Sequence, residues 1–179
     1  IVDAARKAMI VTVPGAWVAE CFKRDMRIQP RVIGHGIDLD AWTPAENKGY
    51  VLFNKNRNDD VCDPTPAWEL AKRGALTIAT FLPYGEHAPA TMTVIGSQPH
   101  ARMKELIRHA DVYLATTRET FGIGTLEALA SGVPVLGYDW GGTAELIQHE
   151  VNGYLVQPGD IDGLLAGLDW LHNHPETRQ

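Results

Sequence analysis

Cysteine is scarce in this chain of 179 residues, which has only Cys21 and Cys62. The two stand 41 positions apart, and no C-x-x-C pair occurs. The sequence therefore predicts neither a disulfide framework nor a zinc knuckle. A reducing cytoplasm is the expected environment.

Long hydrophobic runs are also missing. No stretch approaches the roughly 20 consecutive apolar residues that a membrane-spanning helix needs. The first seven residues, IVDAARK, mix acidic and basic side chains, unlike a signal peptide. We expect a cytoplasmic protein without a transmembrane segment, with peripheral attachment to a membrane left open for a longer form of it.

Positive charge is in the minority, with 16 Lys and Arg against 22 Asp and Glu, and the net charge is −6 with His neutral. General binding to nucleic acid or to anionic lipid depends on basic side chains, so a nucleic-acid partner is disfavoured. One local anion pocket is not excluded. The seven histidines are scattered without an H-x-x-x-H pair, so no metal site is expected.

Three catalytic motifs are absent as well. The chain has no G-x-S-x-G nucleophile elbow. It has no Walker loop, because no Gly-Lys-Ser/Thr follows a glycine-rich turn. Gly122 and Gly124 begin a dinucleotide fingerprint, but Glu127 stands where its third glycine is needed. A dehydrogenase is therefore disfavoured.

What the chain does contain is an alternation of short apolar strands and helices. This alternation predicts an α/β fold, a Rossmann-like doubly wound parallel sheet with helices on both faces. The first 36 residues, with strands at 9–13 and 30–33 around a helix at 14–24, look like the edge of another unit, and residues 37–179 like the sheet domain. Strands are expected at 50–53, 76–81, 92–95, 111–115, 133–136 and 154–156, and helices at 66–73, 101–109, 122–131, 143–149 and 161–172.

Ligands of such sheets bind outside the carboxyl ends of the strands. The segment 116–127 leaves a strand, turns on Gly122 and Gly124, and enters a helix. Glycine lets the backbone approach a ligand, and a helix N-terminus favours a phosphate. Glu127, one turn into the helix, is positioned to accept hydrogen bonds from a ribose diol, while Glu119 faces the same mouth. A plain helix cap, with Glu127 favoured only by the helix dipole, is the alternative.

Two further segments follow strands. Gly141 and Gly142 open the next helix, which carries Glu145, so the two glycine turns would form the walls of one groove. Lys55 and Arg57 form the basic cluster after the first strand of the sheet and are positioned to bind a diphosphate. Salt bridges to the nearby aspartates are the alternative for this cluster.

Taken in order, these motifs resemble the retaining glycosyltransferases of family 4, which have the GT-B fold. The resemblance rests on E-x-F-G at 119–122 and E-A-L-A-S-G-V-P-V at 127–135. G-G-T-A-E at 141–145, N-G-Y-L-V at 152–156 and P-G-D at 158–160 follow. V-I-G-H-G-I-D at 32–38 resembles the end of the family's first domain, with His35 in place of the usual Asn.

The resemblance implies half of a GT-B enzyme: the donor domain that binds a nucleoside diphosphate sugar, with the N-terminal acceptor domain missing. Such an enzyme moves a hexose-like sugar to an acceptor hydroxyl without a cofactor or metal, and this stretch alone is expected to bind nucleotide but to transfer sugar poorly. Two alternatives stay open: a non-catalytic module that binds sugar nucleotides, and a GT-B epimerase.

The resemblance also implies roles for individual residues. Glu119 approaches the donor sugar as the catalytic residue, Glu127 holds the ribose, and Arg57 binds the diphosphate. The family's diphosphate Lys is absent near Cys62, and Lys55 is the candidate substitute. The remaining donor-binding candidates are Phe121, Gly122, Ile123, Gly124, Thr125, Gly141 and Gly142.

Overall fold

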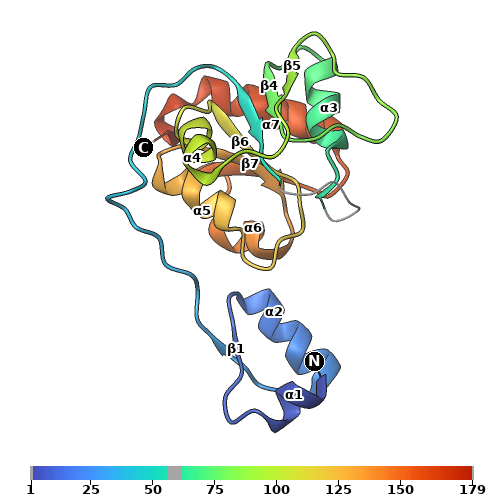
Figure 1. Cartoon of the computed structure of the whole chain (residues 1–179), viewed down its shortest axis with the longest axis vertical. Coiled ribbons are helices and arrows are strands. Elements are labelled where there is room, and N and C mark those ends of the chain that lie inside the picture. The colour runs from blue at the N-terminus through green and yellow to red at the C-terminus, as the bar shows by residue number, and fades with distance from the viewer. Residues whose placement is uncertain (1, 56–61, 179) are drawn as a thin grey trace.

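The computed structural model describes residues 2–55 and 62–178, and its centre is a six-stranded parallel sheet (Figure 1). The strands lie in the order β5-β4-β3-β6-β7-β8. The chain thus enters the sheet in the middle, builds outward on one side, and returns to build the other side. The strands are β3 (Val51–Phe53), β4 (Thr77–Ala79), β5 (Met92–Val94), β6 (Val112–Ala115), β7 (Val135–Tyr138) and β8 (Gly153–Val156).

Helices cover both faces of this sheet, as the alternating sequence predicts. One face packs against α3 (Thr65–Lys72) and α7 (Ile161–Asn173), and the other against α4 (His100–Arg108) and α5 (Ile123–Ala130). The short helix α6 (Gly141–Leu146) follows β7, and a 3-10 turn, Pro175–Thr177, follows α7. The fold is therefore the expected doubly wound α/β sheet.

Each strand of the centre supplies both cores, because successive side chains point to opposite faces. Val51 and Phe53 of β3 lie in the core under α3 and α7, whereas Leu52 between them lies in the core under α4 and α5. On β6, Leu114 joins the first core and Tyr113 the second. Strands buried on both faces have to be continuously apolar, which explains the unbroken apolar runs in the sequence.

A second, smaller unit precedes the sheet. It contains α1 (Val2–Lys7), β1 (Thr12–Val13), α2 (Ala16–Cys21), a π-helical turn at Phe22–Met26, and β2 (Arg31–Val32). β1 and β2 form their own two-stranded parallel sheet. Residues 33–50 then run as an extended connection past the larger unit to β3 (Figure 1).

Element bounds differ from the sequence expectations at one place that bears on the site. The strand expected at 133–136 runs on through Gly137 to Tyr138, and the helix expected at 143–149 begins two residues earlier, at Gly141. A Cβ at Gly137 would lie 2.9 Å from the carbonyl oxygen of Ala115 and 2.9 Å from a methyl of Thr143. Gly137 is therefore a close-packing position inside the strand rather than its end.

Candidate functional site

The order of the strands along the chain reverses between β3 and β6. This position is the topological switch point of the sheet, and an open α/β sheet binds ligands there. Lys55 follows β3 there, and Glu119 lies in the loop after β6. The Nζ atom of Lys55 donates a hydrogen bond to Oε1 of Glu119 over 2.7 Å. The Lys55 side chain is 8% exposed and that of Glu119 37% exposed, so the carboxylate is the part of the pair that solvent reaches.

The surroundings of Lys55 keep it charged. Burial alone would lower the pKa of its ammonium, but the neighbouring Tyr113 hydroxyl and the Glu119 carboxylate outweigh burial, and the pKa lies above the ordinary value of 10.5. Its backbone is fixed as well, because the Lys55 amide donates to Oγ1 of Thr80 over 2.9 Å. A fixed positive charge next to a carboxylate is thus present at the carboxyl edge of the sheet.

The loop after β6 turns into α5 on two glycines, as the sequence predicts. Gly122 has φ 94°, the left-handed region that disfavours side chains. A Cβ at Gly124 would overlap the hydroxyl of Tyr113, which lies beneath the first turn of α5. Gly122 caps α5 without a side chain, so the amides of that turn point outward with the positive end of the helix dipole. An anion is the ligand that such a turn favours.

The second glycine turn packs against this loop instead of standing apart from it. The Gly142 amide donates to the Glu119 carbonyl oxygen over 2.9 Å. Cβ atoms would collide with the Phe121 backbone at Gly142 and with the Glu119 carbonyl at Gly141. Gly141 and Gly142 therefore allow α6 to support the loop that carries Glu119.

Glu127 lies one turn into α5, with 15% of its side chain exposed. Burial raises the pKa of its carboxyl, an effect that His100 partly offsets. Oε1 of Glu127 lies 3.7 Å from Nε2 of His100, and the His100 ring meets the Trp42 ring edge to face. A cavity of about 260 Å³ next to Glu127 is lined by His35, Gly36, Ile37, Asp38, Trp42, Ile123, Leu126 and Glu127.

The remaining candidates divide by exposure. The side chain of Ile123 is 55% exposed, whereas Thr125 is buried beneath the turn. The Phe121 ring meets the His35 ring edge to face at 4.9 Å, which links the loop to the connection from the N-terminal unit. Arg57 lies outside the described residues.

Sequence reasoning missed two members of this region. Tyr113 reads as one more apolar position of a buried strand, yet its hydroxyl lies next to Lys55 and under Gly124. Trp17 lies in α2 of the N-terminal unit, yet its indole nitrogen donates to the carbonyl of Thr120 over 2.9 Å. Local sequence patterns carry no signal for a contact such as Trp17–Thr120, whose residues lie 103 positions apart, or for the direction in which the Tyr113 side chain points.

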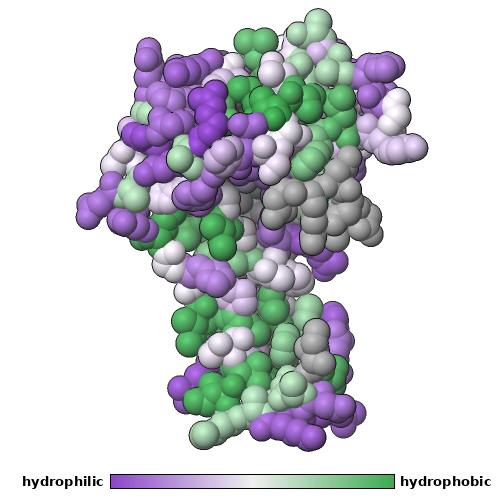
Figure 2. Space-filling view, viewed as in Figure 1, coloured by the Kyte–Doolittle hydropathy of each residue, from purple (hydrophilic) through white to green (hydrophobic). Residues whose placement is uncertain are grey.

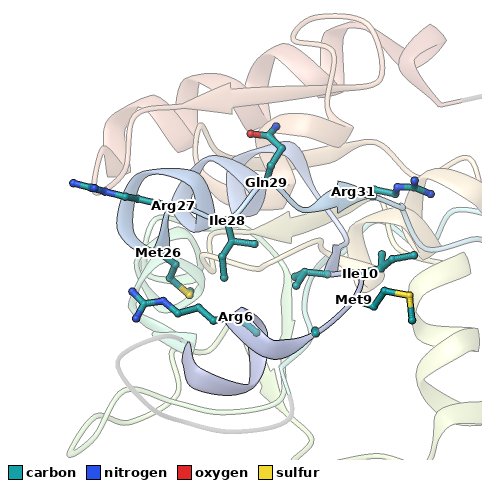
Figure 3. A pocket seen from close by; sticks show the side chains of 11 residues that line it. Arg6, Met9, Ile10, Met26, Arg27, Ile28, Gln29 and Arg31 are labelled. Atoms are coloured by element: carbon teal, nitrogen blue, oxygen red, sulfur yellow. The ribbon is translucent and has the colours of Figure 1, made fainter.

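A second cavity, of about 480 Å³, lies in the N-terminal unit (Figure 3). The side chains of Ile10, Met26 and Ile28 face the same space as Arg6. The surface of this unit also carries apolar residues, and Figure 2 shows hydrophobic colour on it, below the waist that separates it from the larger unit. Its large exposed apolar side chains include Val2, Met9, Ile10, Val32 and Ile33.

Neither a metal cluster nor a membrane-spanning helix occurs over 2–55 and 62–178. Within these ranges, no three His, Cys, Asp or Glu side chains gather closely enough to hold a metal ion. No helix in the same ranges has the length and hydrophobicity that crossing a membrane requires.

The fold and the site define an open α/β domain that carries a lysine–glutamate pair and a glycine-rich helix start where its strand order reverses. Residues 84–179 match the family described as glycosyl transferases group 1, and the chain belongs to this family. Over 68 residues it is 44% identical to an uncharacterized glycosyltransferase of Methanocaldococcus jannaschii, covering 37% of this chain and 17% of that protein. Over 79 residues it is 38% identical to N-acetyl-alpha-D-glucosaminyl L-malate synthase of Bacillus anthracis, covering 44% and 20%.

Solved structures share the fold at low sequence identity. Sucrose-phosphate synthase from Thermosynechococcus elongatus superposes with a TM-score of 0.82 at 19% identity, over 99% of this chain and 52% of that one. HepE of Anabaena, in complex with UDP-glucose, gives 0.80 at 18% identity, over 98% and 57%. The C-terminal domain of the group 1 glycosyl transferase LpcC from Francisella tularensis gives 0.64 at 20% identity, over 80% and 91%.

The chain is shorter than the two curated relatives and than the first two structures. Its matches span about a fifth of the length of the two curated relatives, and it spans just over half of the first two structures.

Proposed function

We propose that this chain is the donor-binding domain of a retaining, family 4 glycosyltransferase that moves a hexosyl group from a nucleoside diphosphate sugar to an acceptor hydroxyl. The observation that carries the proposal is the Lys55–Glu119 pair at the switch point, next to the open first turn of α5. Family membership supports it, and so does the likeness to HepE, whose structure holds UDP-glucose.

In this proposal each group has one task. The diphosphate lies on the first amides of α5, with Lys55 and Arg57 supplying positive charge. Glu127 accepts hydrogen bonds from the ribose hydroxyls, and the Glu119 oxygen that does not face Lys55 accepts them from the donor sugar. As the bond from the anomeric carbon to the diphosphate breaks, these fixed charges stabilise the leaving group, a role that requires no metal and no further cofactor.

The proposal extends to a partner domain. Parallel strands are normally buried on both faces, yet both residues of β2 are exposed and apolar side chains surround β1 and β2. This exposed surface is our argument for an acceptor domain that packs on the N-terminal unit and extends its sheet. In this proposal residues 1–36 are part of the acceptor domain, and residues 37–179 are the donor domain.

Calorimetry with UDP, GDP, ADP and their 2′-deoxy analogues tests the ribose contact. We expect the chain to prefer one ribonucleotide over its deoxy form. Glu127→Ala should weaken binding about tenfold and abolish the preference, because hydrogen bonds to a carboxylate contribute roughly 1.5–3 kcal/mol. Glu69→Ala is the matched control, since this glutamate pairs with Lys72 on α3, on the other face of the sheet.

Failure to bind any of these nucleotides would contradict the proposal. Product analysis of the complete protein with donor alone separates a transferase from an epimerase, because only an epimerase changes the configuration of the sugar without an acceptor. Binding without transfer by the complete protein would favour a non-catalytic module.

A further inference from the structure

The helix α2 of the N-terminal unit is capped by a residue of the sheet domain. Two backbone amides at its start, Ala16 and Trp17, donate to the two carboxylate oxygens of Glu145 over 2.8 and 2.5 Å. Glu145 belongs to α6, and Figure 1 shows α6 facing α2 across the waist of the molecule. The first amides of a helix have no partners within it, so this carboxylate satisfies groups that α2 cannot satisfy itself.

Gly15 makes room for the contact. Its own backbone is extended, with φ −143°, a conformation open to any residue. A Cβ at this position, however, would lie 2.9 Å from Oε2 of Glu145 and 3.3 Å from the carbonyl oxygen of Thr120. The start of α2 thus sits directly on α6 and on the loop that carries Glu119.

Trp17 extends the contact along the same loop. Its indole nitrogen donates to the Thr120 carbonyl over 2.9 Å. The guanidinium of Arg118 lies 5.4 Å from the centre of the Trp17 ring and 5.9 Å from that of Trp140. The Thr120 carbonyl and the Arg118 side chain therefore both contact Trp17 of α2.

The helix α6 contacts the same loop through the hydrogen bond from the Gly142 amide to the Glu119 carbonyl. The helix α6 therefore makes two contacts. Gly142 in its first turn binds the loop directly, and Glu145 in its last turn binds α2, which packs on the same loop. The Glu119 side chain leaves this clamped backbone to reach Lys55.

We propose that Glu145 and Trp17 are positioning residues, which fix the loop 118–121 and thereby aim the Glu119 carboxylate at the donor sugar. The contact of Glu119 with a donor sugar rests on the proposed function. Productive geometry tolerates displacements of only about 0.5 Å, so loosening this backbone should cost the contact with the sugar more than the contact with the nucleotide.

The first test needs no ligand. Hydrogen exchange of the backbone amides at 118–121 should become at least tenfold faster in Glu145→Ala and in Trp17→Phe, and less so in Glu145→Gln, which keeps one acceptor oxygen. Glu20→Gln is the control, because Glu20 lies on α2 and pairs with Lys23 at the exposed surface. Unchanged exchange in both Glu145→Ala and Trp17→Phe would overturn the proposal.

The second test measures affinity for UDP-glucose and for UDP by calorimetry. In Glu145→Ala we expect the dissociation constant for UDP-glucose to rise about tenfold and that for UDP at most twofold. A lowered unfolding temperature with an unchanged ratio of the two affinities would mean that Glu145 is only structural, and would overturn its positioning role. If the unmutated chain binds neither compound, the proposed function fails for this donor, while the exchange experiment still decides whether the clamp exists.

Discussion

Replacing Lys55 and Glu119, singly and together, measures how strongly the pair at the switch point is coupled. Removing one partner of a fully buried ion pair costs about 3–5 kcal/mol. Lys55→Met should cost less, about 1–2 kcal/mol, because Glu119 is 37% exposed and water can solvate the carboxylate that remains. Glu119→Gln leaves a buried ammonium facing an amide and should cost about 2–3 kcal/mol.

The double variant should be at least as stable as Lys55→Met alone, because no charge is then left without its partner. Urea unfolding at pH 7 gives the free energies, with the slope checked for constancy. The pKa of Lys55 lies above 10.5, so the contribution of its charge is complete at pH 7 and is lost only as pH rises through that folded-state value. The exposed pair Arg73–Asp162 is the control, with an expected coupling below about 0.5 kcal/mol. Effects of Lys55 and Glu119 that add to within about 0.5 kcal/mol would refute the reasoning.

Three more outcomes follow from the same region. Burial raises the pKa of Glu127 above its ordinary 4.5, so the folded state binds this proton more tightly than the unfolded state does. The free energy of unfolding therefore falls as pH rises from the unfolded-state pKa through the folded-state pKa. In urea unfolding at pH 4 and pH 7, Glu127→Gln should remove this fall, and a Glu127→Gln effect of equal size at both pH values would contradict the argument. Gly124→Ala forces a Cβ onto the Tyr113 hydroxyl and should cost about 1–3 kcal/mol of unfolding free energy, which Tyr113→Phe should partly restore; equal cost in both backgrounds would show that the overlap is not the cause. Finally, nucleotide binding measured by calorimetry should survive EDTA, and loss that magnesium reverses would disprove metal independence.

The sequence predicts the sheet well because each buried strand and each helix has a local signature. Periodicity and glycine turns place β3, β6 and the start of α5 within a few residues of their observed positions. One general rule misleads: a glycine after an apolar run usually ends a strand, but Gly137 stays inside β7 because its backbone packs against Ala115.

Contacts between distant segments are harder to predict. The family resemblance named Lys55 and Glu119 separately, but only the parallel order of β3 and β6 brings their side chains together across 64 positions. The Tyr113 hydroxyl under Gly124 and the Glu145 carboxylate on α2 depend on side-chain direction after folding. No residue pattern within a single helix or strand carries that information.

The central position of β3 also affects how the protein folds while the ribosome is still making it. β4 follows β3 in the chain and pairs with one of its edges, but the opposite edge stays open until Val112–Ala115 has been made. An open edge beside apolar side chains such as Leu52 is the kind of surface on which nascent chains aggregate. Slow translation of residues 95–111 prolongs this exposed state, so codon choice over α4 should influence the yield of folded protein.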